Sequence, residues 1–272
     1  MNVPNIRLNT GDEIPQVGLG LWLNKDKDEC KSSVKVALDA GYTHFDTAQI
    51  YNNEQFLGEA LQEAGADRKN LFITTKIWNE NQYWDDIEPS LDESLDKLKT
   101  DYVDLLLLHF PVTETRRPAW RKMEEIYHSG KAKAIGVSNY TIRHLEELLA
   151  ENKVVPAVNQ VEIHVFLQQP ELLDFCKRHN IVVEAYSPLA HGMGMNDPVL
   201  VEIAKAHNKS TAQIMLRWCV QQDLVVLPKS VHPDRIQQNI DLFNFELSDD
   251  EMQRLTTLER DLRTCWDPTH VQ

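Results

Sequence analysis

The chain has 272 residues, of which 42% are hydrophobic and 26% charged, and its formal net charge is −14. This composition is typical of a soluble globular protein, and the negative charge would repel the phosphate backbone of a nucleic acid. The most uniformly apolar run, Leu105 to Leu108, is too short to cross a bilayer. We therefore expect neither nucleic acid nor a membrane among the partners of this protein.

Four cysteines, Cys30, Cys176, Cys219 and Cys265, stand at no spacing typical of metal ligands or of a redox motif. We interpret them as reduced thiols of a cytosolic protein. The first segment, MNVPNIRLNTGDEIP, is polar and has no apolar core of a signal peptide. We therefore expect a cytoplasmic protein. No apolar stripe in the sequence requires a dimer, so we expect a monomer.

Strand and helix patterns alternate along the chain after a short hairpin. NIRLNTGDEIP predicts that hairpin, with its turn near Gly11 and Asp12. Short apolar segments that end near a polar residue then predict eight strands, at 16–22, 43–46, 71–76, 103–109, 134–138, 157–162, 182–187 and 224–230. Between them, amphipathic segments with capping residues predict helices, among them 28–41, 53–65, 87–99, 119–130 and 141–152.

Eight strand-helix units predict a closed (β/α)8 barrel, the TIM-barrel fold, as one domain over residues 1–272. A doubly wound open sheet is the alternative, because alternation by itself does not separate the two folds. An open dinucleotide-binding sheet carries a G-x-G-x-x-G turn between a strand and a helix. Here Gly18 and Gly20 are followed by Leu23 at the third position, which favours the barrel.

Polar residues stand where three of the predicted strands end. Asp46, Lys76 and His109 each close an apolar run, and Tyr51 follows Asp46 by five residues. The carboxyl ends of barrel strands carry the functional residues in this fold. A lysine ammonium beside a tyrosine would lower the phenol pKa from about 10, and a carboxylate would hold the ammonium in place. A neutral imidazole would orient the reacting oxygen, so the four predict proton donation to a carbonyl.

A metal-dependent barrel hydrolase is a rival interpretation. Asp46, His109, Glu162 and His164 are all residue types that bind metals, and all stand near strand ends. No paired ligand spacing is repeated, however, and the ammonium of Lys76 would repel a metal ion. We therefore expect no metal.

Three segments resemble the signatures of the aldo-keto reductases. They are GYTHFDTAQIYNNEQFLG at 41–58, KAIGVSNY at 133–140 and LPKSVHPDRIQQN at 227–239. The resemblance runs over nearly the whole chain and is nearest in kind to the microbial 2,5-diketogluconate reductase-type members. It implies a (β/α)8 barrel, a nicotinamide cofactor, reduction of aldehydes and ketones, and a catalytic tetrad of Asp46, Tyr51, Lys76 and His109.

The third signature predicts where the cofactor would be held. Lys229, Ser230 and Arg235 supply charged donors and a hydroxyl of the kind that a 2′-phosphate needs, so we expect NADPH as the cofactor. Asn239 would contact the adenine edge. This local positive charge contrasts with the acidity of the whole chain.

The other cofactor contacts are expected at the ends of later strands. Ser138, Asn139 and Gln160 would bind the carboxamide, and Tyr186 offers a flat face to the nicotinamide ring. The resemblance implies the same assignments. The pyrophosphate would lie beside two residues of the next segment, Ser187 and Leu189.

Aromatic residues next to the tetrad predict a pocket that excludes water. Trp22, Trp78 and Phe110 would form its mouth, and Trp266 in the tail is placed to touch a substrate. The short tail suits small aldehydes, ketoacids or sugar-derived dicarbonyls. An alternative from another class is an NADPH-binding sensor or structural protein that keeps the fold without turnover.

Overall fold

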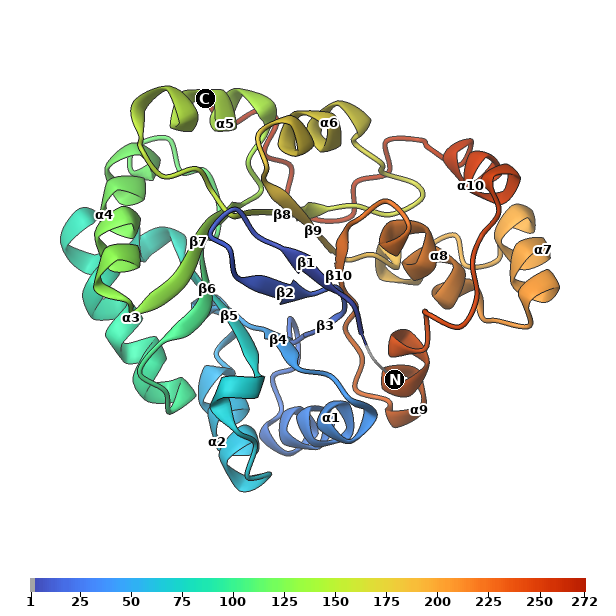
Figure 1. Cartoon of the computed structure of the whole chain (residues 1–272), viewed down its shortest axis with the longest axis horizontal. Helices are drawn as coiled ribbons and strands as arrows, with labels where there is room; N and C mark the ends of the chain where they lie inside the picture. Colours follow the sequence, from blue (N-terminus) through green and yellow to red (C-terminus); the bar gives the residue numbers. More distant parts are fainter. Residues whose placement is uncertain (1–2) are drawn as a thin grey trace.

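A barrel of eight parallel strands forms the centre of the protein in the computed structural model, which describes residues 3–272 (Figure 1). Gly20 donates its backbone N–H to the oxygen of Pro228, and Val17 bridges Val226, so the first and last strands meet. The predicted (β/α)8 barrel is confirmed, and residues 1 and 2 lie outside the described residues. The strands are β3 (Gly18–Gly20), β4 (His44–Asp46), β5 (Phe72–Ile77), β6 (Val103–Leu108), β7 (Ala132–Ser138), β8 (Val158–Glu162), β9 (Val182–Tyr186) and β10 (Val225–Leu227).

The predicted amino-terminal hairpin is also present, as β1 (Asn5–Arg7) paired antiparallel with β2 (Glu13–Pro15). Gly11 in its turn has φ of 96°, which glycine adopts without the strain of a side chain. The hairpin crosses one end of the barrel in Figure 1. Leu8 and Ile14 pack there with interior residues such as Leu105 and Val158. Because it closes the amino-terminal end, it leaves the carboxyl ends of the strands for a site.

Helices surround the barrel (Figure 1), and the five helical segments predicted above are all helical. Their buried faces pack on the strands and form the main apolar core. Capping is as expected at α1, where Asp26 accepts from the N–H of Glu29 and Gly41 ends the helix at φ 96°. The helices are α1 (Lys27–Ala40), α2 (Glu54–Glu63), α3 (Trp84–Leu98), α4 (Arg116–Ser129), α5 (Ile142–Glu151), α6 (Pro170–Arg178), α7 (Pro198–His207), α8 (Thr211–Val220), α9 (Pro233–Ile240) and α10 (Asp249–Thr256).

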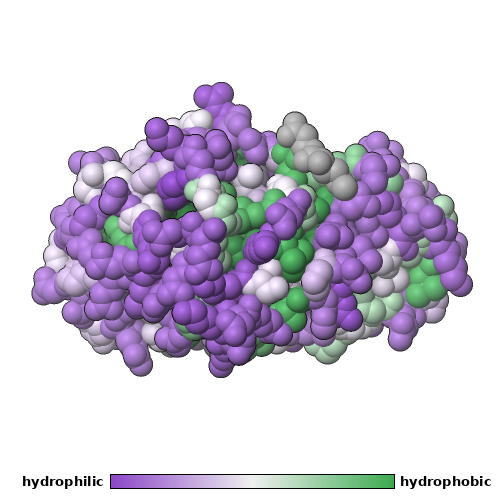
Figure 2. Space-filling model, turned by 90° about the horizontal axis from the view of Figure 1, so that it is seen from below, coloured by the Kyte–Doolittle hydropathy of each residue, from purple (hydrophilic) through white to green (hydrophobic). Residues whose placement is uncertain are grey.

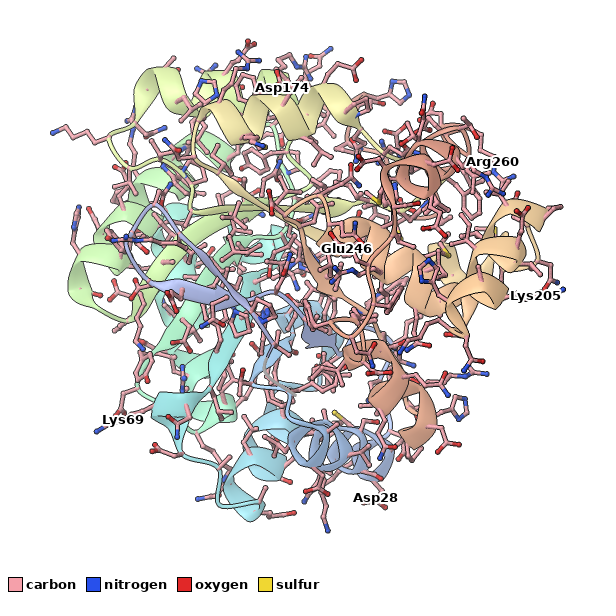
Figure 3. The ribbon with its side chains drawn as sticks, turned by 45° about the vertical axis from the view of Figure 1, so that its right-hand side comes forward. Asp28, Lys69, Asp174, Lys205, Glu246 and Arg260 are labelled. Carbon is pink, nitrogen blue, oxygen red and sulfur yellow. The ribbon has the colours of Figure 1, made fainter. Side chains whose placement is uncertain are left out.

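The outer surface is largely hydrophilic. Figure 2 shows one face, on which hydrophobic residues gather in recesses near the middle. Figure 3 shows charged side chains such as Lys205 on α7 and Asp174 on α6 pointing outward. Within residues 3–272, no helix has the length and apolar character needed to span a membrane.

Helix α2 packs closely on α3 at Gly58, so we expect a larger residue there to lower stability. A methyl group added to Gly58 would lie 2.8 Å from the backbone of Leu98. The crowding costs more than the gain in helix propensity, so Gly58→Ala should lower the free energy of unfolding by about 1–2 kcal/mol. Urea unfolding would measure it, with Gln55→Ala on the exposed side of α2 as a control expected within about 0.5 kcal/mol of wild type. An unchanged stability of Gly58→Ala would contradict the packing argument.

Candidate active site

A buried ion pair lies where β4 and β5 end. The ammonium of Lys76 donates to both carboxylate oxygens of Asp46, at 2.7 and 2.8 Å, and to the backbone oxygen of Thr47 at 3.0 Å. Lys76 is fully buried and Asp46 almost so. The hydroxyl of Tyr51 lies 3.4 Å from the same ammonium. Three of the four predicted catalytic side chains therefore meet in one place.

The turn after β4 holds Tyr51 in that position. A 3-10 helix, η1 (Gln49–Tyr51), follows the strand and ends at Asn52, whose φ is 57°. The buried side chain of Asn53 accepts a hydrogen bond from the Thr47 hydroxyl at 2.6 Å and donates to the backbone oxygen of Leu21 at 2.9 Å. These bonds tie the turn to the residue that follows β3, so the phenol is attached to the scaffold rather than to a free loop.

The sequence-based prediction that the pKa of Tyr51 is lowered is wrong. Burial, the negative charge of Asp46 and the thiol of Cys265 raise the pKa of Tyr51 well above its usual value. From the sequence, we expect Lys76 to lower this pKa. The charge of Lys76 is instead paired with Asp46, which leaves no net positive charge beside the phenol. Tyr51 is therefore a neutral hydroxyl that can donate a proton.

His109, the residue after β6, completes the cluster. Its ring meets the ring of Tyr51 edge-on, with centroids 5.6 Å apart. Burial and the charge of Lys76 hold the pKa of His109 well below its usual value, so the imidazole is neutral. Its Nδ1 is buried without a hydrogen-bond partner within residues 3–272. A ring held neutral in this way is available to a ligand.

A cavity of about 560 Å³ opens over the cluster at the carboxyl ends of the strands. Lys76 does not line the cavity, and neither do five other predicted residues: Trp78, Phe110, Ser230, Arg235 and Asn239. Twelve predicted residues do line it: Trp22, Asp46, Tyr51, His109, Ser138, Asn139, Gln160, Tyr186, Ser187, Leu189, Lys229 and Trp266.

Hydrogen bonds fix the amide-rich wall of the cavity. Asn139, at φ 64°, donates to the backbone oxygen of His109 at 3.0 Å and accepts from the Tyr186 hydroxyl at 2.6 Å. Ser138 donates its hydroxyl to the backbone oxygen of Gln160 at 2.9 Å. The end of β7 is thereby joined to β8 and β9, and the ring of Tyr186 is held in place.

Positive charge collects near the start of α9, where Lys229 lines the cavity. Lys229 and Arg235 are both exposed, and no carboxylate of the described chain lies within ion-pair distance of either. The hydroxyl of Ser230 accepts the N–H of His232 at 3.1 Å, and Asn239 is buried on α9. Unpaired cations at a helix amino terminus are a favourable setting for an anion.

The profile of the Aldo/keto reductase family matches residues 16–260. The chain belongs to the aldo/keto reductase family. It is therefore an oxidoreductase that acts on aldehydes and ketones, as the sequence resemblance implied.

Relatives of this reductase match over almost the full chain. Glyoxal reductase of Bacillus subtilis is 44% identical over 266 residues, which is 98% of this chain and 96% of the relative. An aldo-keto reductase from a Medee basin deep-sea metagenome library has a TM-score of 0.95 at 38% identity, covering 99% of this chain and 100% of that one. A Bombyx mori aldo-keto reductase solved in complex with NADP has a TM-score of 0.94 at 33% identity, with both chains fully covered.

The carboxyl-terminal tail of the reductase forms a wall of the cavity that sequence reasoning largely missed. Glu162, at the end of β8, accepts the backbone N–H groups of Thr264 at 2.8 Å and Cys265 at 3.0 Å, and also the Thr264 hydroxyl. The thiol of Cys265 in turn lies 3.2 Å from Nε2 of His191. The sequence signal for this contact is Glu162 itself, a carboxylate at a strand end, which the sequence pattern suggests only as a possible metal ligand.

The hydrogen bonds between Glu162 and the tail give Glu162 and His164 a structural role that requires no metal. Nε2 of His164 lies 3.2 Å from the carboxylate of Glu162, whose other hydrogen bonds come from the tail. Burial alone would raise the pKa of Glu162, but the bonds from His164, Thr264 and Cys265 outweigh it and lower that pKa. Within residues 3–272, no three His, Cys, Asp or Glu side chains are grouped as metal ligands.

Removing the charge of Glu162 should release the tail. In Glu162→Gln, an amide group replaces one accepting oxygen, so amide exchange at Thr264 and Cys265 should become roughly 10–100-fold faster, as expected for the loss of a charged hydrogen bond. Hydrogen exchange with mass spectrometry would measure it. Asp267→Asn is the matched control, because Asp267 bonds only within the tail. Unchanged protection in Glu162→Gln would show that another contact holds the tail.

Proposed function

We propose that this aldo/keto reductase uses NADPH to reduce small aldehydes, ketoacids or sugar-derived dicarbonyls, with Tyr51 as the proton donor. The observation that carries the proposal is the hydroxyl of Tyr51 in the cavity, 3.4 Å from the ammonium of Lys76. The same cavity is lined by His109. The likeness to 2,5-diketogluconate reductase-type enzymes stays a prediction.

The residues present fit NADPH. One cavity is lined by Tyr51 and His109, by Tyr186 and the amide wall, and by Lys229. Lys229 and Arg235 have no carboxylate partner in residues 3–272, so their charge is available to a 2′-phosphate. When bound, NADPH supplies the hydride for the carbonyl carbon. Its remaining contacts would come from Ser138, Asn139, Gln160, Tyr186, Ser187, Leu189, Ser230 and Asn239.

The protein groups divide the proton chemistry among them. The neutral phenol of Tyr51 donates its proton to the carbonyl oxygen as negative charge develops there. Lys76 then stabilises the phenolate that is left, at the cost of part of its interaction with Asp46. The neutral imidazole of His109 holds the carbonyl oxygen by a hydrogen bond and directs it toward Tyr51.

The aromatic wall keeps water from the reaction and limits the substrate. Trp22 and Trp266 line the cavity. Trp78 and Phe110 contact Trp266, with ring centroids 5.6 and 6.2 Å from its ring, and their place at the mouth stays a prediction. Trp266 is 43% exposed, which leaves an open side for a small carbonyl compound.

Turnover is favoured over a sensor without activity. A sensor needs the cofactor contacts but has no use for a buried ammonium, a neutral imidazole and a phenol directed at the same cavity. We propose further that residues 1–272 act as one domain and as a cytoplasmic monomer whose partner is a small carbonyl compound, without a membrane or nucleic acid partner. The free thiols of all four cysteines support the cytoplasmic location.

Replacing the phenol tests the proton donor. Tyr51→Phe should lower kcat for a panel of small aldehydes by about 10²–10⁴-fold, because the carbonyl oxygen loses its acid. The dissociation constant for NADPH should stay within about twofold, since the ring remains. Absorbance at the NADPH band measures the first, and quenching of tryptophan fluorescence the second. Tyr83→Phe, at an exposed tyrosine, is the control, and wild-type turnover of Tyr51→Phe would refute the assignment.

Removing one cation tests the cofactor preference. Lys229→Ala should weaken NADPH binding by roughly 10-fold at low salt and NADH binding by less than about twofold, because only NADPH has the 2′-phosphate. Titration calorimetry would compare the two. Lys205→Ala removes an equal charge on the outside of α7 (Figure 3) and should change neither. If Lys229→Ala weakens the binding of NADPH and NADH equally, Lys229 does not bind the 2′-phosphate.

A further inference from the structure

A second carboxyl group lies beside the ion pair of the active site. Glu184 on β9 has no solvent exposure, and its strand register places it next to Gln160 of β8. The amide nitrogen of Gln160 donates to Oε2 of Glu184 and to Oδ2 of Asp46, each at 2.9 Å. One amide group thus bridges two buried carboxyls. Neither Glu184 nor this bridge was predicted from the sequence.

The charges around Glu184 do not support a second anion. Lys76 on β5 is already bonded to both oxygens of Asp46 on β4. His44 of β4 lies 3.6 Å from Oε1 of Glu184, but burial lowers the pKa of His44 to about 4, so it carries no charge at neutral pH. Tyr51 faces the same group of residues as a neutral phenol. A buried carboxylate without a cation of its own takes up a proton.

The pKa of Glu184 agrees with this balance of charges. Burial and the negative charge of Asp46 raise the pKa of Glu184 to about 8. Below that pH the side chain is a neutral acid, and Oε1 has no hydrogen-bond partner in the described chain. The group can therefore accept the amide of Gln160 without adding charge to the barrel interior.

We propose that Glu184 is a positioning residue, which as a neutral acid orients the Gln160 amide between β9 and β4 and which slows carbonyl reduction when it ionises. The proposal rests on the proposed function, in which Gln160 contacts the cofactor and Asp46 holds Lys76. Both hydrogens of the Gln160 amide point at carboxyls, so its oxygen is left for a ligand in the cavity that Gln160 lines.

Ionisation of Glu184 changes the site through charge. The proton leaves to solvent, and a second negative charge then acts on Lys76 together with that of Asp46. The ammonium is less available to stabilise the phenolate of Tyr51, so proton donation becomes slower. The Gln160 amide meanwhile is drawn more strongly to Glu184 than to Asp46. Both effects weaken the reduction as the pH rises.

Glu184→Gln removes the ionisable carboxyl group and keeps the shape of the side chain. Wild-type kcat/KM should fall about tenfold between about pH 7 and about pH 9, and that of Glu184→Gln by less than about twofold. Glu54→Gln is the matched control, because Glu54 on α2 is another buried acid and its carboxylate accepts a hydrogen bond from Thr75 on β5. It should keep the wild-type dependence of kcat/KM on pH. The same alkaline fall in Glu184→Gln would overturn the proposal.

A second variant separates positioning from charge. Glu184→Leu removes the acceptor of the Gln160 amide as well as the titration, so NADPH should bind about tenfold more weakly than to Glu184→Gln at about pH 7. Glu184→Gln itself should bind NADPH within about twofold of wild type. Equal affinities of the two variants would refute the positioning role.

Two measurements without cofactor report on the proton itself. Infrared spectra of the wild type should show a protonated-carboxyl band at about pH 6 that is absent from Glu184→Gln. Because the folded pKa lies above the unfolded one, wild-type stability falls as the pH rises from about 4.5 to about 8, so the urea midpoint of Glu184→Gln should rise relative to wild type over that window. If the infrared band and the shift in urea midpoint are both absent, the proposal for Glu184 is overturned, even if Tyr51→Phe behaves as expected. If both are present but Tyr51→Phe is active, only the proposed function is refuted.

Discussion

The ion pair between Lys76 and Asp46 is the interaction on which the rest of the site depends. An ammonium in the dry interior of a barrel is stable only with a close partner, and Asp46 gives Lys76 both of its oxygens. The two residues stand on adjacent strands, so the barrel itself fixes their distance. The hydroxyl of Tyr51 is then placed relative to a rigid scaffold, which is the arrangement that a proton donor needs.

The pair also decides the charge of its neighbours. One cation and one anion balance each other, and burial opposes any further charge. The pKa values of Tyr51 and Glu184 are raised, and those of His109 and His44 are lowered, which in all four cases favours the neutral form. Neutral donors and acceptors around one ion pair are suited to moving a single proton, because each of them can take part without building a second buried charge.

Residues far apart in the sequence complete the site through the tail. Glu162 holds the backbone of Thr264 and Cys265, and Trp266 is thereby brought against His109, with ring centroids 5.6 Å apart. Trp78 also contacts the ring of Trp266, with centroids 5.6 Å apart. Trp78 is predicted at the mouth because it stands two residues after Lys76, but nearness in the chain does not show which aromatic rings line the cavity.

Sequence by itself determined the barrel, the hairpin and the four residues of the predicted catalytic cluster, because each depends on local patterns: a period of two or 3.6, a capping residue, a polar residue where an apolar run stops. Only the tertiary structure decided the protonation states and the partners of Glu162 and Glu184. A pKa depends on burial and on charges contributed by other strands, as Tyr51 shows, and a lone glutamate within VVEAYS carries no local sign of the amide and the carboxylate that closure of the barrel brings beside it.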